Sequence, residues 1–142
     1  MCGIIGISSN KSVSANIVNS LKKLEYRGYD SAGVATLFDG EINEVKSEGR
    51  VDNLEQNFDL KSLKGNIGIG HVRWATHGVP NSINAHPHSS DSVSVVHNGI
   101  IENSTILKKH LVIKGHTFKS QTDTEVIVHL ITENLKTMEL EE

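Results

Sequence analysis

The sequence is poor in several residue types that would each support a particular kind of protein. Its 142 residues contain one cysteine, two prolines and 4% aromatic residues. One cysteine cannot form an internal disulfide, so the expected setting is the reducing cytoplasm. No apolar run approaches the roughly 18 residues of a membrane span, and the first residues lack the basic and apolar regions of a signal peptide. A cysteine at position 2, in place of glycine, excludes N-myristoylation.

Neither sign of charge predominates. The formal net charge is -3 at pH 7, and the basic residues are dispersed along the chain. No basic surface for nucleic acid or for an anionic membrane is therefore predicted. The length fits one globular domain with a core of ordinary size.

The lone cysteine, Cys2, directly follows Met1 at the head of an apolar, glycine-containing segment, residues 1–6 (MCGIIG). If Met1 is removed, one residue carries both a thiol nucleophile and a free α-amine, whose ordinary pKa of roughly 7.7–8.0 suits it as a base. The apolar residues that follow indicate a buried strand that fixes this end of the chain. A lone cysteine in an apolar strand is also commonly a small core residue, so the residues alone leave both interpretations open.

The spacing of apolar residues predicts a mixed set of helices and strands. Asp39 and Gly40 join two alternating runs as a hairpin turn. The expected helix caps are a serine at position 12 or 14, Asn103, and a capping box at residues 122–125. The order of elements shows no sustained βαβ repeat, which favours an α+β fold. The predicted helices run from residue 12 or 14 to about 25, over 52–58, over 103–113 and onward from 122; the predicted strands cover 1–6, 34–38, 41–47, 66–74, 92–97 and 116–120.

Glycines and loops mark the remaining segments. Gly68 and Gly70 leave one face of a predicted strand without side chains, so that another backbone or a ligand can approach it. The loop at residues 75–92 is long and contains both prolines, and long loops in compact domains are usually functional or disordered. Asn98-Gly99 is a strong signal for a type I′ hairpin, although the helix predicted directly after it argues against a simple hairpin.

Eight histidines raise the alternative of a metalloprotein. No carboxylate or thiol lies at a useful ligand spacing from them, so we expect neither a metal site nor a cofactor. The histidines considered as ligands are His71, His77, His86, His88 and His97.

Six separated stretches together resemble the glutaminase domain of the class II, N-terminal-nucleophile glutamine amidotransferases. Within that family, the amino-acid sequences of these stretches are most similar to those of the glucosamine-6-phosphate synthases. The resemblance implies the four-layer αββα sandwich of N-terminal-nucleophile hydrolases, an α+β fold. The stretches are residues 1–6 (MCGIIG), 24–33 (LEYRGYDSAG), 71–78 (HVRWATHG), 84–88 (NAHPH), 97–103 (HNGIIEN) and 122–125 (TDTE).

The resemblance implies hydrolysis of the side-chain amide of L-glutamine to glutamate and ammonia. Cys2 is implied to attack the amide carbon and form a glutamyl thioester, with its own α-amine moving the proton. The side-chain amide of Asn98 and the backbone N–H of Gly99 are implied to form the oxyanion hole.

The resemblance also assigns groups to the other end of glutamine, which carries an α-carboxylate and an α-ammonium. Arg73 is implied to bind the carboxylate, since a guanidinium can donate two parallel hydrogen bonds to it. Asp123 is implied to bind the ammonium. Trp74, Thr76 and His77 are implied to line the pocket around them.

Other residues of the six stretches are assigned to the framework. Arg27 and Asp30 are interpreted as loop architecture, and His71, His86 and His97 as hydrogen-bonding framework. Gln121 departs from the family pattern, in which an acidic residue is frequent, and this departure affects no implied catalytic role.

The family's glutaminase domain continues past residue 142, so the resemblance implies a partial domain, truncated on its C-terminal side. The sugar-isomerase domain that would accept ammonia and fructose 6-phosphate is expected to be absent. A separate chain or domain of that kind is then a possible partner, besides L-glutamine and a second copy of this chain. The alternative hypothesis is a truncated, non-catalytic remnant that binds glutamine or another protein.

Overall fold

A four-stranded antiparallel sheet, in the order β1-β4-β2-β3, lies at the centre of the fold. The structure is a computed structural model that describes residues 1–75 and 78–138. Strand β4 is central and pairs with both β1 and β2, so it carries the register of the whole sheet. The four strands are β1 (Gly3–Ser8), β2 (Ser31–Phe38), β3 (Glu41–Glu48) and β4 (Ile67–Arg73).

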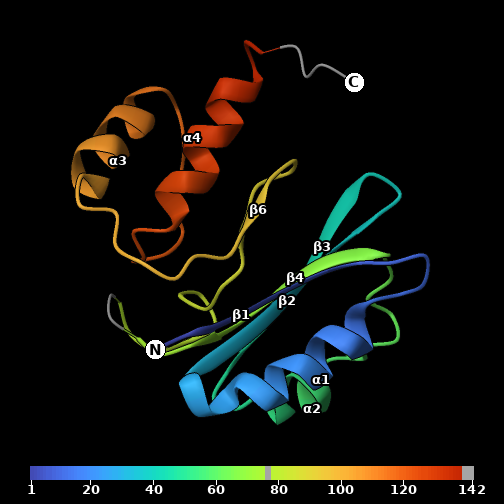
Figure 1. The fold of residues 1–142 in the computed structure, drawn as a ribbon. Helices are drawn as coiled ribbons and strands as arrows, with labels where there is room; N and C mark the ends of the chain where they lie inside the picture. The colour runs from blue at the N-terminus through green and yellow to red at the C-terminus, as the bar shows by residue number, and fades with distance from the viewer. Residues whose placement is uncertain (76–77, 139–142) are drawn as a thin grey trace.

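Helices and a smaller sheet cover the two faces of this central sheet (Figure 1). Helices α1 (Ser14–Leu24) and α2 (Asp52–Asn57) lie on one face, and the short 3-10 helix η1 (Glu25–Arg27) follows α1. On the other side lie the two-stranded sheet and then the outer helices, which completes a helix-sheet-sheet-helix order. The α+β sandwich predicted from the sequence is thereby confirmed. The elements of the second half are β5 (His88–Ser89), β6 (Ser94–Val95), α3 (Ser104–Ile113) and α4 (Glu125–Leu135).

The main core lies between α1 and the central sheet. Ile17 and Leu21 of α1 are fully buried against it. Their close approach depends on Gly70 of β4, because a Cβ atom there would lie 2.5 Å from Ile17 Cγ2. Gly68 faces the same helix in the same way. The glycine face predicted in this strand is therefore real, and helix α1 occupies it.

The hairpin between β2 and β3 follows the predicted turn. Asp39 and Gly40 have φ angles of 52° and 79°. A type I′ turn requires positive φ at both central residues, and Asp and Gly are among the residues that adopt it most readily. This prediction is confirmed.

The strand predicted at residues 116–120 is wrong, because a side chain takes the backbone donors that a strand would need. The N–H groups of Lys119 and Ser120 donate to the carboxylate of Glu125 at 2.8 and 2.7 Å. The capping box predicted at residues 122–125 is wrong for the same reason. The N-cap of α4 is Thr124 and makes no side-chain cap bond, since Glu125 reaches back to residues 119 and 120.

Two further predictions of local structure need correction. The strand predicted over residues 92–97 shortens to β6. The N-cap of α1 is Val13 rather than a serine, and Ser14 Oγ donates to Leu60 O at 3.2 Å instead of capping the helix. Asn103 does occupy the N-cap position of α3, without a side-chain cap bond. None of the helices within residues 1–75 and 78–138 has the length and apolar character of a membrane span.

We expect Gly70→Ala to lower the free energy of unfolding by about 1–3 kcal/mol, because the added methyl group overlaps Ile17. Gly6→Ala in β1 is the matched control, since its nearest atom, Ile69 Cγ2, would be 3.9 Å away. Urea titrations of both variants and the wild type measure the difference. Equal stability of the Gly70 and Gly6 variants would contradict the packing of α1 on β4.

Candidate active site

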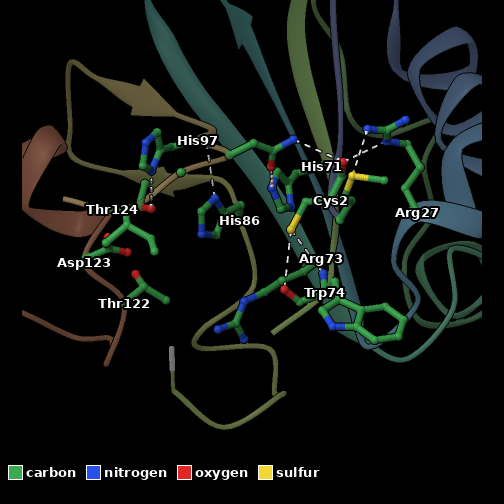
Figure 2. Close-up of a pocket in the computed structure, with 14 residues that line it drawn as sticks. Cys2, Arg27, His71, Arg73, Trp74, His86, His97, Thr122, Asp123 and Thr124 are labelled. Atoms are coloured by element: carbon green, nitrogen blue, oxygen red, sulfur yellow. Dashed lines mark hydrogen bonds between the residues drawn. The ribbon is translucent and has the colours of Figure 1, made fainter. Parts of the chain in front are cut away.

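A pocket of about 340 Å³ brings together side chains from both halves of the fold (Figure 2). Thr76 and His77, also predicted for this site, lie outside the described residues. The predicted site residues that line the pocket are Cys2, Arg73, Trp74, Asn98, Gly99 and Asp123.

The pairing of β1 with β4 sets the position of Cys2. Gly3, the first residue of β1, is opposite Val72 in the antiparallel register, so Cys2, which directly precedes β1, lies beside the end of β4. The thiol lies against the backbone of Trp74, whose N–H donates to Cys2 Sγ at 3.2 Å and whose carbonyl oxygen is 3.5 Å from the same sulfur.

The backbone carbonyl of Cys2 is held by two donors from distant parts of the chain. Arg27 Nε donates to it at 3.1 Å, and Asn98 Nδ2 donates to it at 3.2 Å. Arg27 also lines the pocket, so its role is wider than the loop architecture predicted from the sequence. Together these contacts fix the backbone of the residue that carries the thiol.

A cation and an anion line the part of the pocket away from the thiol. Arg73 is only 4% exposed, and its Nη1 donates to Val79 O at 3.4 Å. Asp123 Oδ2 accepts the N–H of Ile101 at 2.6 Å. In Figure 2, the guanidinium of Arg73 points toward the wall that carries Thr122 and Asp123. The arrangement suits a small zwitterion.

The loop after α1 supports the chain at Arg73 and Trp74. A Cβ atom at Gly28 would lie 2.5 Å from Arg73 C and 2.7 Å from Trp74 N, so only glycine fits this contact. The N–H of Asp30 donates to Arg73 O at 3.2 Å, and the Asp30 carboxylate accepts the N–H of Ala75. These contacts agree with the interpretation of Asp30 as loop architecture.

Three buried histidines lie next to one another beside the pocket. The rings of His71 and His86 stack with their centroids 4.3 Å apart, and the rings of His86 and His88 are 4.8 Å apart. None of the three is more than 5% exposed. Burial lowers the pKa of His71 and that of His88 to about 4, and it lowers the pKa of His86 further. All three imidazoles are therefore neutral at physiological pH.

The buried imidazoles hold segments that line the pocket. His86 Nδ1 accepts the N–H of His97 at 3.4 Å, and His88 Nε2 is 2.8 Å from Thr122 Oγ1. His97 Nδ1 is in turn 3.2 Å from Thr124 Oγ1. These bonds agree with a framework role. Within residues 1–75 and 78–138, no group of three or more His, Cys, Asp or Glu residues is arranged to hold a metal ion.

Thr122 and Thr124 line the pocket, and sequence reasoning did not predict them as site residues. Their segment was interpreted as a helix cap, and no local pattern distinguishes a capping threonine from one that lines a pocket. Gln121 also has a role here, because its Oε1 accepts the N–H of Val79 at 3.2 Å and Asn84 Nδ2 at 3.0 Å. It thus ties down the segment whose carbonyl contacts Arg73.

Comparison of the amino-acid sequence with known proteins identifies one family. Residues 58–139 match the family described as "Glutamine amidotransferase domain". The glutamine–fructose-6-phosphate aminotransferase (isomerizing) of Mesorhizobium japonicum is 58% identical over 135 residues, which cover 95% of this chain and 22% of that protein. The proteins of the same name from Pyrococcus horikoshii and Clostridium acetobutylicum are 56% and 59% identical, over 96% and 92% of this chain. The chain spans about a fifth of the length of these curated relatives.

Solved structures agree with this match. The glutamine phosphoribosylpyrophosphate amidotransferase from B. subtilis superposes with a TM-score of 0.78 at 31% identity, over 100% of this chain and 30% of that one. A structure described as the allosteric regulatory enzyme of purine biosynthesis superposes with a TM-score of 0.79, also at 31% identity and over 100% of this chain and 30% of that one. The similarity thus extends over the whole arrangement of layers.

We expect the free energy of unfolding to fall when the pH is lowered from 7.0 to 5.0. The ordinary pKa of a histidine is 6.5, whereas folded His71 and His88 have pKa values of about 4. Below pH 6.5 the unfolded chain therefore binds protons that the folded chain does not, and stability decreases down to about pH 4. The expected loss is about 2 kcal/mol for each of the two groups.

Urea titrations at the two pH values measure this loss. His110→Gln is the matched variant for comparison, because His110 is exposed on α3 and lies outside the cluster of buried imidazoles. A wild-type protein that is equally stable at pH 7.0 and pH 5.0 would show that the buried imidazoles bind protons as readily in the folded chain as in the unfolded chain, which would contradict this expectation.

Proposed function

The chain belongs to the glutamine amidotransferase domain family, and from this premise we propose that it hydrolyses the side-chain amide of L-glutamine to glutamate and ammonia. The observation that carries the proposal is the single pocket shared by a thiol, an amide donor, a buried cation and a carboxylate. These groups are supplied by Cys2, Asn98, Arg73 and Asp123.

Cys2 acts as the nucleophile. Its sulfur attacks the amide carbon of glutamine, the C–S bond forms, and the C–N bond breaks as ammonia leaves. Water then attacks the thioester and releases glutamate. A thiol with an ordinary pKa near 8.5 is only a few per cent ionised at pH 7, so it needs a base within hydrogen-bond reach. Removal of Met1 supplies that base as the α-amine of Cys2, which takes the thiol proton and passes it to the leaving nitrogen.

Asn98 and Gly99 stabilise the oxyanion that forms during the attack. Asn98 Nδ2 already lies 3.2 Å from the carbonyl oxygen of Cys2, so this donor is adjacent to the nucleophile. The backbone N–H of Gly99 is the second donor of the proposed oxyanion hole. Loss of one such donor typically lowers kcat by about 10²–10³.

Arg73 and Asp123 hold the charged end of glutamine. The guanidinium binds the α-carboxylate and the carboxylate binds the α-ammonium, which places the side-chain amide near the thiol. Trp74 forms part of the wall of the same pocket.

We infer the fate of the ammonia from the relatives, which are named glutamine–fructose-6-phosphate aminotransferases and are several times longer than this chain. The proposed acceptor is a sugar-isomerase domain or chain that uses ammonia and fructose 6-phosphate. The proposed site of the reaction is the cytoplasm, in keeping with a chain whose single cysteine must stay reduced.

Cys2→Ala is expected to abolish release of ammonia from L-glutamine, because no other nucleophile is proposed. Coupled assays for ammonia and glutamate measure turnover. Ser8→Ala, at the opposite end of β1, is the control and should retain wild-type turnover. Turnover by the Cys2 variant would contradict the mechanism. Glutamine binding by the wild type without ammonia release would favour the alternative of a non-catalytic binding module.

Arg73→Lys is expected to raise KM for L-glutamine roughly 10- to 100-fold, because charge-assisted hydrogen bonds contribute about 1.5–3 kcal/mol. Asp123→Asn should also raise KM for L-glutamine, because it removes the carboxylate proposed to bind the α-ammonium. Steady-state kinetics should be repeated with 4-aminobutanamide, which lacks the α-carboxylate. If Arg73 binds that carboxylate, the Arg73 variant should discriminate less than the wild type between the two amides. Unchanged discrimination would exclude the assignment.

A further inference from the structure

The side-chain amide of Asn98 lies between two partners that it can face in two ways. Its Oδ1 is 2.9 Å from His71 Nε2, and its Nδ2 donates to Cys2 O at 3.2 Å. Turning the amide by 180° would exchange the oxygen and the nitrogen. Only one of the two orientations directs the NH₂ group toward the residue that carries the thiol.

The protonation of His71 selects that orientation. The ring is neutral, because burial lowers its pKa to about 4, so it carries one N–H group. Asn98 Oδ1 can only accept a hydrogen bond, and the proton of the imidazole therefore resides on Nε2. His71 Nδ1 has no hydrogen-bond partner among the described residues. The turned amide would need the proton on Nδ1, and it would place its oxygen against the carbonyl oxygen of Cys2, where neither atom can donate a hydrogen bond.

The ring of His71 is itself held firmly. His71 belongs to β4, where it pairs with Ile4 of β1 on one side and with Gly33 of β2 on the other. His71 is 1% exposed, and its ring stacks on that of His86, which accepts the N–H of His97, the residue just before Asn98. The His71 ring that orients the Asn98 amide is thus fixed on β4, and β4 pairs with β1, the strand that Cys2 directly precedes.

We propose that His71 is a positioning residue, whose Nε2–H fixes the carboxamide of Asn98 with its NH₂ group directed at Cys2. The catalytic consequence rests on the proposed function, in which that NH₂ group stabilises the oxyanion. An interaction made only in the transition state affects kcat, whereas binding of glutamine depends on other groups. Loss of the His71 donor therefore lowers kcat and leaves KM near its wild-type value.

Two substitutions at His71 separate this role from packing. His71→Gln retains an N–H donor near the position of Nε2, and His71→Leu has a similar volume without a donor. With L-glutamine, the Leu variant should lose roughly 10-fold or more in kcat, within the 10²–10³ expected for complete loss of an oxyanion donor, and the Gln variant should retain most of the activity. In an Asn98→Ala background, His71→Leu should cause no further loss. Equal losses in the two single variants, a change in KM alone, or additive losses in the double variant would overturn the proposal.

A measurement on the unliganded wild-type chain tests the proposal without turnover. Nitrogen-15 NMR at pH 7 should show His71 with a protonated Nε2 and an unprotonated Nδ1. The side-chain NH₂ signals of Asn98 should shift more in His71→Leu than in His71→Gln. A proton on Nδ1 overturns the proposal even if both variants fail to fold. If the wild-type chain releases no ammonia, the proposed function fails, and the NMR result still decides whether His71 orients Asn98.

Discussion

The antiparallel register between β1 and β4 is the constraint on which the site depends. Side chains alternate between the faces of a strand, so a shift of one residue would turn every side chain of β1 to the opposite face. The register is held by continuous pairing from Gly3 opposite Val72 to Ser8 opposite Ile67, and by the packing of α1 on the glycines of β4. This register brings the thiol of Cys2 to the backbone of Trp74.

The second constraint on the site is that the buried imidazoles beside the pocket stay uncharged. His71, His86 and His88 connect the central sheet to segments of the smaller half, and His86 Nδ1 can accept the N–H of His97 only while that nitrogen is unprotonated. The rings of His71 and His86 stack on each other. In a neutral imidazole one ring nitrogen can donate a hydrogen bond and the other can accept one. The segment of Asn98 is thus bonded to His71 of β4, the strand that carries Arg73, and the segment of Thr122 is bonded to His88 of β5.

Features determined by neighbouring residues could be predicted from the sequence, and features determined by distant partners could not. The hairpin turn at Asp39 depends on the preference of two adjacent residues for positive φ, and the α1 helix depends on regular apolar spacing. By contrast, no local sequence pattern predicts that Arg27 contacts Cys2, or that Glu125 binds the backbone of residues 119 and 120. These contacts depend on how the folded chain brings the partners together. The candidate site residues themselves were predicted through resemblance to a family, since Asn98 read alone indicated a hairpin turn.

The proposed mechanism requires that the sulfur of Cys2 be a nucleophile beside a free α-amine. The most direct test is the intact mass of the chain before and after incubation with an electrophilic glutamine analogue, followed by peptide mapping. We expect a chain without Met1 that gains one adduct, located on Cys2 and prevented by excess L-glutamine. A chain that keeps Met1, or that gains no adduct on Cys2, would contradict it.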